Sequence, residues 1–316
     1  MGSKYIAENK TKNVLEHKAK VRSLEKTDKN RIKRKKLNRI TTSKIFVYII
    51  MISLVAFTAM PLIYVVSTAF KPLDELFIYP PRFLVRNPTI QNFTELLIAL
   101  SSSAVPFTRY VFNSIFTVSI TVFITVIISS LGAFALVKYN LPGGKWIFSI
   151  ILAALMFSPH VTQIPNYMVV NSLGIIDTYL ALIIPKLAAA YNFFLMKQFI
   201  EQFPNELLEA GRIDGAKEWA LFWRIVMPSL KPAWSTLVVF SFVSNWNDYF
   251  TPLIFTTSEA MKTLPLALNT ISGGGSIARA GATSAAVFLM TIPTIVIFTS
   301  MQSRVMETMV HSGIKA

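Results

Sequence analysis

Six apolar runs, each long enough to cross a lipid bilayer, constrain this chain more than any other feature. A transmembrane helix needs about 20 mainly apolar residues. The runs cover residues 45–66, 110–137, 146–170, 173–196, 232–257 and 280–303. Only 15% of the 316 residues are charged, against roughly 25% in a soluble domain. The sequence therefore predicts an all-α membrane protein with six transmembrane helices, some kinked by internal prolines such as Pro159 and Pro185.

The basic residues predict how these spans are oriented. Residues 1–44 contain 15 Lys or Arg and 4 Asp or Glu. With both ends in the cytoplasm, the cytoplasmic segments hold 24 Lys or Arg and the outer segments hold 5. Because short cytoplasmic segments of membrane proteins are enriched in Lys and Arg, we expect both termini inside. Residues 1–44 are expected to form a basic cytoplasmic tail that contacts anionic lipid, and they show no pattern of nucleic-acid binding.

A charged segment, residues 201–232, separates the fourth and fifth runs and would lie in the cytoplasm. A first helix is expected to open near Pro204 and Asn205, where Asn can cap it, and to end in a left-handed turn at Gly215. A second helix would cover residues 219–226 and stop before the next proline. An ordinary amphipathic loop could have this composition. A bend with small residues on top and charges at its rim could also be gripped by another protein.

The spacing in this segment resembles the EAA motif of permeases from ATP-binding-cassette (ABC) importers. In that motif, three residues separate EAA from a Gly, and nine residues separate this Gly from the sequence I-x-L-P. The matching residues are Glu209, Ala210, Gly211, Asp214, Gly215, Ala216, Ile225 and Pro228. Gly211 replaces the second Ala, and Met227 replaces the Leu before the proline. The resemblance implies that this is a coupling loop, inserted into a groove of an ATP-hydrolysing partner. Glu209 and Asp214 would orient it there, and its small residues would allow close approach.

Other segments resemble the smaller permease of maltose-type sugar importers, so that the resemblance covers residues 45–316. They include NPTIQNF at 87–93, RYVFNS at 109–114 and KTLPL at 262–266. The resemblance implies a six-span permease domain with a type I importer fold in the bacterial cytoplasmic membrane. The implied partners are a second homologous permease, two ATP-binding cassette subunits and an extracellular sugar-binding protein. ATP and Mg²⁺ would bind to those partner subunits, and this chain would bind no cofactor.

Polar residues in the fifth run are candidates for the translocation path. They are Asn245, Asn247, Asp248 and Tyr249. Burying an ionisable side chain in a membrane costs several kcal/mol unless a partner compensates it. Asn245 and Asp248 would share one helix face, and Trp246 or Tyr249 could offer a ring face to a sugar. Hydrogen bonding between helices near the outer interface explains the same residues equally well.

Two further segments are given roles by the resemblance. Gly273, Gly274 and Gly275 form a flexible tip between the last two runs, where the maltose-type permease reaches into the cleft of the binding protein. A simple mobile linker would have the same glycines. The C-terminal residues Gly313 and Lys315 resemble an ending that inserts between the two ATPase subunits, although Ala316 replaces the family's final Gly.

The sequence contains no recognisable catalytic or metal-binding site. It has no Cys and 3 scattered His, and it lacks the patterns of a P-loop, a zinc protease and a nucleophile elbow. We therefore predict a permease subunit of an ATP-driven carbohydrate importer, which is not itself an enzyme. An ABC permease for another solute, such as a peptide or phosphate, is the nearest alternative. A self-sufficient secondary transporter is less favoured, because it would require internal repeats that the sequence does not show.

Overall fold

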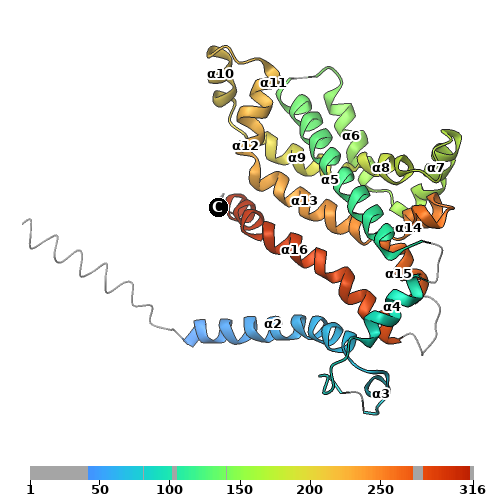
Figure 1. Ribbon diagram of the computed structural model, residues 1–316. Helices are drawn as coiled ribbons and strands as arrows, with labels where there is room; N and C mark the ends of the chain where they lie inside the picture. Colours follow the sequence, from blue (N-terminus) through green and yellow to red (C-terminus); the bar gives the residue numbers. More distant parts are fainter. Residues whose placement is uncertain (1–41, 81, 102–104, 140, 273–279, 314–316) are drawn as a thin grey trace, which may run out of the picture. The chain divides into compact units, whose positions relative to one another are not determined.

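The computed structural model describes residues 42–80, 82–101, 105–139, 141–272 and 280–313 (Figure 1). Over these ranges the chain is almost entirely helical and contains no strand, so the all-α prediction is confirmed. The predicted basic tail up to residue 41, the glycines Gly273, Gly274 and Gly275, and Lys315 fall outside these ranges. The chain divides into two units, Met1–Leu62 and Ile63–Ala316.

The described part of the first unit belongs to one apolar helix, α2 (Thr42–Ala69). Residues 44–58 are all exposed, although most of them are apolar. A helix that is apolar all round is expected either in a protein core or in lipid. Because these side chains are exposed within the chain, α2 has the character of a lipid-facing span, as predicted for residues 45–66.

The second unit is built around α5 (Phe107–Lys138), the predicted second span (Figure 1). The helices that pack most extensively on it are α8 (Tyr179–Leu187), α9 (Ala190–Glu201) and α13 (Lys231–Trp246). The last span, α16 (Ala280–Gly313), packs along α13 and crosses α4 (Gln91–Ser101). Helix α5 therefore connects most of the bundle.

One face of α5 is buried and carries small polar side chains every four residues. They are Asn113, Thr117, Thr121, Thr125 and Ser129. Residues four apart lie above one another on a helix, and small residues let neighbouring membrane helices approach closely. This stripe explains how a helix of 32 residues can pack against three others.

The remaining spans are not single helices. Helices α6 (Gly144–Leu155) and α7 (Pro159–Ser172) meet at an angle of 110°, and α8 meets α9 at 44°. The runs predicted at 146–170 and 173–196, with kinks at internal prolines, are therefore each divided into two helices. Pro159 lacks an amide hydrogen and begins a new helix instead of kinking the old one. Three helices are long and apolar enough to cross a membrane, and the described chain has up to six spans if each bent pair counts as one.

The fifth predicted run, 232–257, is also interrupted. Helix α13 ends at Trp246, and α14 (Phe250–Phe255) follows after a break at residues 247–249. The short elements that complete the described chain are α3 (Leu73–Leu76), α10 (Asn205–Ile213), α11 (Glu218–Ala220), the π-helix η1 (Leu221–Val226), α12 (Met227–Ser229), the 3₁₀ turn η2 (Glu259–Met261) and α15 (Leu264–Ser272).

Candidate functional site

The predicted coupling loop consists of α10 and a second helical stretch, α11 to α12, joined by a sharp turn. Gly215 has φ of 80°, as predicted for a left-handed turn at the end of the first helix. The amide of Ala216 donates to the carbonyl of Gly211 at 3.0 Å, which closes that turn. Asn205 does not cap α10, because it is the first helical residue and Pro204 precedes it. Its side-chain oxygen accepts a hydrogen bond from Lys138 Nζ at 2.7 Å instead.

The small residues of the loop surround a hollow of about 460 Å³. Gly211, Asp214, Gly215, Ala216 and Ile225 line it. The structure thus brings together five residues that are up to 14 positions apart in the predicted motif. The remaining motif residues, Glu209, Ala210 and Pro228, are exposed on the same loop and are not among the residues that line the hollow.

Gly211, the departure from the family's Ala, is buried where the two helical stretches touch. A β-carbon at this position would lie 2.6 Å from Leu221 Cδ2 and 2.7 Å from Ile225 Cδ1. Such distances require both side chains to shift. The glycine therefore allows α10 to lie closer to the second stretch than an Ala at this position would allow.

The second stretch differs from its predicted range of 219–226. It begins at Glu218, passes through the π-helix Leu221–Val226 and continues past Pro228 to Ser229. A proline inside a helix removes one backbone hydrogen bond and crowds the carbonyl four residues earlier. The wider π-helical turn directly before Pro228 changes that hydrogen-bond register, so the helix need not stop there.

Polar contacts join this loop to the C-terminal end of α5, the end predicted to lie in the cytoplasm. Arg212 Nε donates to Glu218 at 2.9 Å, and the Tyr139 hydroxyl donates to the same carboxylate. The hydrogen bond from Arg212, followed by the one from Tyr139, holds the pKa of Glu218 below its ordinary value. Burial and the contact with Glu218 raise the pKa of Tyr139 to about 12. The neighbouring Lys138 donates to the Phe203 carbonyl at 2.7 Å, so α5 is tied to both ends of α10.

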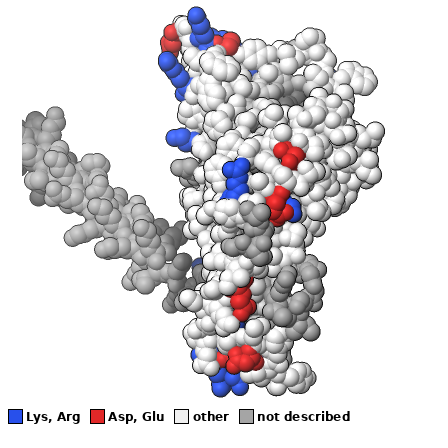
Figure 2. All heavy atoms as spheres, turned by 45° about the vertical axis from the view of Figure 1, so that its right-hand side comes forward, with Lys and Arg blue, Asp and Glu red and all other residues white. Residues whose placement is uncertain are grey.

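Large apolar side chains are exposed on this charged loop, and the sequence reasoning missed them. Ile213 is 86% exposed and Trp219 is 64% exposed. In Figure 2 the blue and red atoms at the upper end of the molecule mark the charged side chains around α10. Exposed apolar groups with a polar rim are typical of protein-binding surfaces. The signal available in the sequence was a large apolar residue, Ile213, between Arg212 and Asp214.

A second site is an open cavity of about 660 Å³ among the bent helices. It is lined by residues of α7, of the α8–α9 bend and of the α13–α14 break. Asn245 and Asp248, two of the predicted path residues, lie in its wall. The other two, Asn247 and Tyr249, line a separate cavity of about 370 Å³ next to α15 and α16. The structure therefore divides the predicted set between two surfaces.

The prediction that Asn245 and Asp248 share one helix face is wrong, because α13 ends at Trp246 and Asp248 lies beyond it. It follows α13, and its Oδ1 accepts the amides of Phe250 and Thr251, each at 3.0 Å, at the start of α14. Its Oδ2 pairs with Lys186 Nζ at 2.7 Å. The break between α13 and α14 is stabilised because the Asp248 carboxylate accepts hydrogen bonds from the first backbone amides of α14. The sequence could not identify Lys186 as the partner, because the two residues are far apart in the chain.

Trp246 is not available to a solute. It is 3% exposed, and its ring nitrogen donates to the Met290 carbonyl of α16 at 3.0 Å. The proposed ring face for a sugar is therefore wrong for Trp246, since burial with a satisfied N–H makes it part of the core. Tyr249 is 41% exposed.

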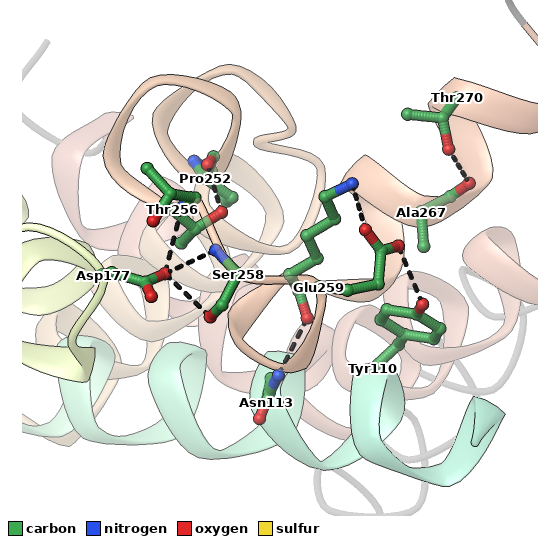
Figure 3. A network of polar contacts seen from close by, with 11 residues as sticks. Tyr110, Asn113, Asp177, Pro252, Thr256, Ser258, Glu259, Ala267 and Thr270 are labelled. Atoms are coloured by element: carbon green, nitrogen blue, oxygen red, sulfur yellow. Dashed lines mark hydrogen bonds and ion pairs between the residues drawn. The ribbon is translucent and has the colours of Figure 1, made fainter. Parts of the chain in front are cut away.

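A polar network fastens the opposite, predicted outer, end of the bundle (Figure 3). Asp177, which has φ of 62°, points toward the segment after α14. Its Oδ1 accepts the amides of Thr257 and Ser258 at 3.0 Å and the Ser258 hydroxyl at 2.9 Å. The loop before α8 is thereby held against the end of the fifth span.

The two outer motifs that were recognised separately in the sequence contact each other. Asn113 Nδ2 donates to the carbonyls of Ala260 and Lys262, both at 2.8 Å. Tyr110 donates to Glu259 at 3.0 Å, as Figure 3 shows, and Ser114 accepts the Leu264 amide at 2.7 Å. The RYVFNS segment therefore serves as the docking site for the segment that leads into α15.

These features define a class of protein. Apolar helices that break around a polar cavity are tolerated in a membrane only where the freed backbone lines a cavity or is buried in protein. Together with the bent loop around Gly215, they are the parts of a polytopic membrane transport subunit. Residues 128–307 match the family described as binding-protein-dependent transport system inner membrane component, and the chain belongs to this family.

Similar proteins cover most of the chain. The sn-glycerol-3-phosphate transport system permease protein UgpE of Yersinia enterocolitica is 32% identical over 85% of this chain and 96% of its own. The lactose transport system permease protein LacG of Rhizobium radiobacter is 29% identical over 63% of this chain and 73% of its own. A chain from the crystal structure of a bacterial ABC transporter involved in the import of the acidic polysaccharide alginate covers 83% of this chain and 98% of its own. Its TM-score is 0.68 at 22% identity, which shows the importer permease fold.

Proposed function

We propose that this chain is one of two permease subunits of an ATP-driven carbohydrate importer in the bacterial cytoplasmic membrane. The observation that supports this proposal most directly is the bent loop around Gly215. Its acidic residues Glu209 and Asp214 form no ion pair within the described chain, and its motif residues surround one hollow. Such a surface suits a groove in a partner that hydrolyses ATP.

Motion of the loop would reach the cavity through α5. Lys138 and Tyr139, at the cytoplasmic end of that helix, are bonded to residues of α10 and α11. Helix α5 also packs against α8, α9 and α13, whose residues line the 660 Å³ cavity. ATP-driven closure of the partner subunits would therefore move a rigid bundle about a solute path, which is a two-state change at packed interfaces.

The proposed partners follow from the family and the earlier resemblance. ATP and Mg²⁺ would bind to two ATP-binding cassette subunits, and this chain would hold no cofactor. A second permease would complete the path, and an extracellular binding protein would deliver the solute. Gly273, Gly274 and Gly275 would contact that binding protein. Gly313, where α16 ends, and Lys315 would contact the ATPase subunits.

A carbohydrate is the solute we favour, and the lactose permease among the similar proteins supports it. The alternative that a specific observation supports is a phosphorylated solute, because a glycerol-3-phosphate permease is 32% identical. The two solutes differ in charge, so the electrostatics of the cavity decides between them.

The coupling role is tested by Gly215→Val and Glu209→Lys in the complete assembly. Valine at φ of 80° distorts the turn at a cost of about 1–2 kcal/mol. We expect both variants to insert and assemble, but to lose most uptake per ATP hydrolysed. Gly174→Val is the matched control, because Gly174 has φ of 66° with open space around it and lies outside the loop. Undiminished coupled uptake in both loop variants would contradict the proposal.

A further inference from the structure

Three helix breaks meet at the 660 Å³ cavity. His160 follows the α6–α7 bend, Ala189 lies in the α8–α9 bend, and Asp248 lies in the α13–α14 break, and all three line the cavity. Each position is interior to one of the apolar runs, at 146–170, 173–196 and 232–257. Broken helices inside a membrane protein are typical of solute sites, because the break frees polar groups to face the ligand.

The wall of this cavity is rich in hydrogen-bonding groups and aromatic rings. Gln163, Asn192, Ser244 and Asn245 contribute amides and a hydroxyl. The Asn245 amide nitrogen is bonded to the Ser241 carbonyl at 2.7 Å, which leaves its oxygen as the group available to a ligand. The rings of Tyr191, Phe240 and Phe250 lie in the same wall. Amides beside aromatic faces suit a polyhydroxylated ligand with apolar ring faces.

The charge of this wall is balanced. Among the described residues that line the cavity, Lys186 is the one Lys or Arg, and Asp248 is the one Asp or Glu. Their 2.7 Å contact pairs the two charges, and the two α14 amides fix the carboxylate in place. A sugar phosphate or uronate would require an unpaired cation, because burying an uncompensated anion is costly. Lys186 could bind an anionic ligand only if its ion pair with Asp248 were broken, and the freed carboxylate would then repel that ligand.

We propose that this cavity is the solute-facing wall of the chain and that the Lys186–Asp248 pair makes it selective for uncharged polyhydroxylated solutes. This inference rests on the proposed function and specifies its solute class. Asp248 and Lys186 act here by setting the charge of the wall. Removing one of them should therefore change which charge is tolerated, and removing both should restore neutrality.

The test uses the absence of native cysteine. Ser244, an exposed residue of the cavity wall, is replaced by Cys in the full chain within its assembly. The measurement is the ratio of modification rates by a sulfonate-bearing and a trimethylammonium-bearing methanethiosulfonate of equal length. We expect a ratio near that of an uncharged thiol in solution. Asp248→Asn, which can still accept the α14 amides, should raise the ratio about tenfold, and Lys186→Met should lower it by a similar factor. The double variant should return it to the starting value.

Both modification rates are measured on the same preparation of each variant, so a loss of folded protein would lower both rates together. It could not raise their ratio in Asp248→Asn and lower it in Lys186→Met. A ratio that neither single substitution moves, or that strongly favours one reagent at the outset, would overturn the proposal. In a second arm, a neutral glucan oligosaccharide should slow the modification of Ser244→Cys more than a uronate oligosaccharide of the same length. Equal or stronger protection by the uronate, or protection by neither, would also overturn it. The proposed function is tested separately by measuring ATP-dependent carbohydrate uptake by the assembly. Absence of any such uptake would contradict the proposed function, whatever the ratio of modification rates.

Discussion

At the scale of single residues, a few close contacts fix where helices meet. Asn92 is 1% exposed and donates to the carbonyls of Ala69 and Lys71 at 2.9 and 2.7 Å. Gly281, near the start of α16, lies directly against this amide. A β-carbon on Gly281 would overlap the Asn92 oxygen and lie 2.7 Å from its Cγ. Since both amide hydrogen bonds hold Asn92 in place, it cannot move aside freely.

We therefore predict that Gly281→Ala destabilises the protein by about 1–3 kcal/mol, the usual cost of overpacking. The melting temperature of the purified full chain should fall. Asn92→Ala alone should also be destabilising, because it leaves two carbonyls unpaired. In the double variant the Asn92 side chain that overlaps the new β-carbon is absent. The double variant should therefore lose less stability than the sum of the losses in the two single variants. Strict additivity, or an unchanged melting temperature for Gly281→Ala, would contradict this account of the contact.

At the scale of elements, the coupling loop is held in shape by the carboxylate of Glu218, which joins α11 to α10 and α5. Hydrogen bonds from Arg212 and then Tyr139 hold the pKa of this group below its ordinary value of 4.5. A lowered pKa in the folded state means that the charged form is favoured there. The stabilisation is therefore complete at neutral pH and is lost as the pH falls below 4.5 through the folded-state value.

This predicts an acid transition in the hydrogen exchange of residues 205–229. After correction for intrinsic rates, protection should be constant between about pH 7 and pH 5 and should fall at lower pH. Glu218→Gln should lower the protection by up to about fivefold at neutral pH, as expected for an exposed ion pair, and should abolish the transition. Glu209→Gln is the control, because Glu209 forms no ion pair within the described residues. An acid transition that persists in Glu218→Gln would show that another group is responsible.

The sequence predicts most of the elements but few of their junctions. Gly215 could be foreseen as a left-handed turn, because its position after a helical run leaves few other roles. Pro159 predicts a kink, yet a proline does not encode the 110° angle between α6 and α7. The pairing of Lys186 with Asp248, and of the RYVFNS segment with residues 259–264, depends on contacts between distant parts of the chain. Local patterns contain no information on such contacts.

At the scale of the whole molecule, the chain is a permease, and we propose that it works through partner subunits. On the face drawn in Figure 2, charged side chains lie at the upper end, at the lower end and in a few places between them, and the rest of that face carries no charged side chain. The family assignment and the importer fold make this a transport component. The central claim is that the loop around Gly215 lies in the cytoplasm and is moved by another subunit's ATP hydrolysis.

The most direct measurement of that claim is site-specific cross-linking from Ala210→Cys, an exposed position of the motif in a chain without native cysteine. In membranes containing the full assembly, a photoreactive group on this thiol should cross-link to an ATP-binding subunit, with a yield that changes when ATP is added. In intact cells the thiol should resist a membrane-impermeant maleimide, while Ile90→Cys, exposed on the predicted outer segment, reacts. Labelling of Ala210→Cys from outside, or cross-links that never reach a nucleotide-binding chain, would contradict the account.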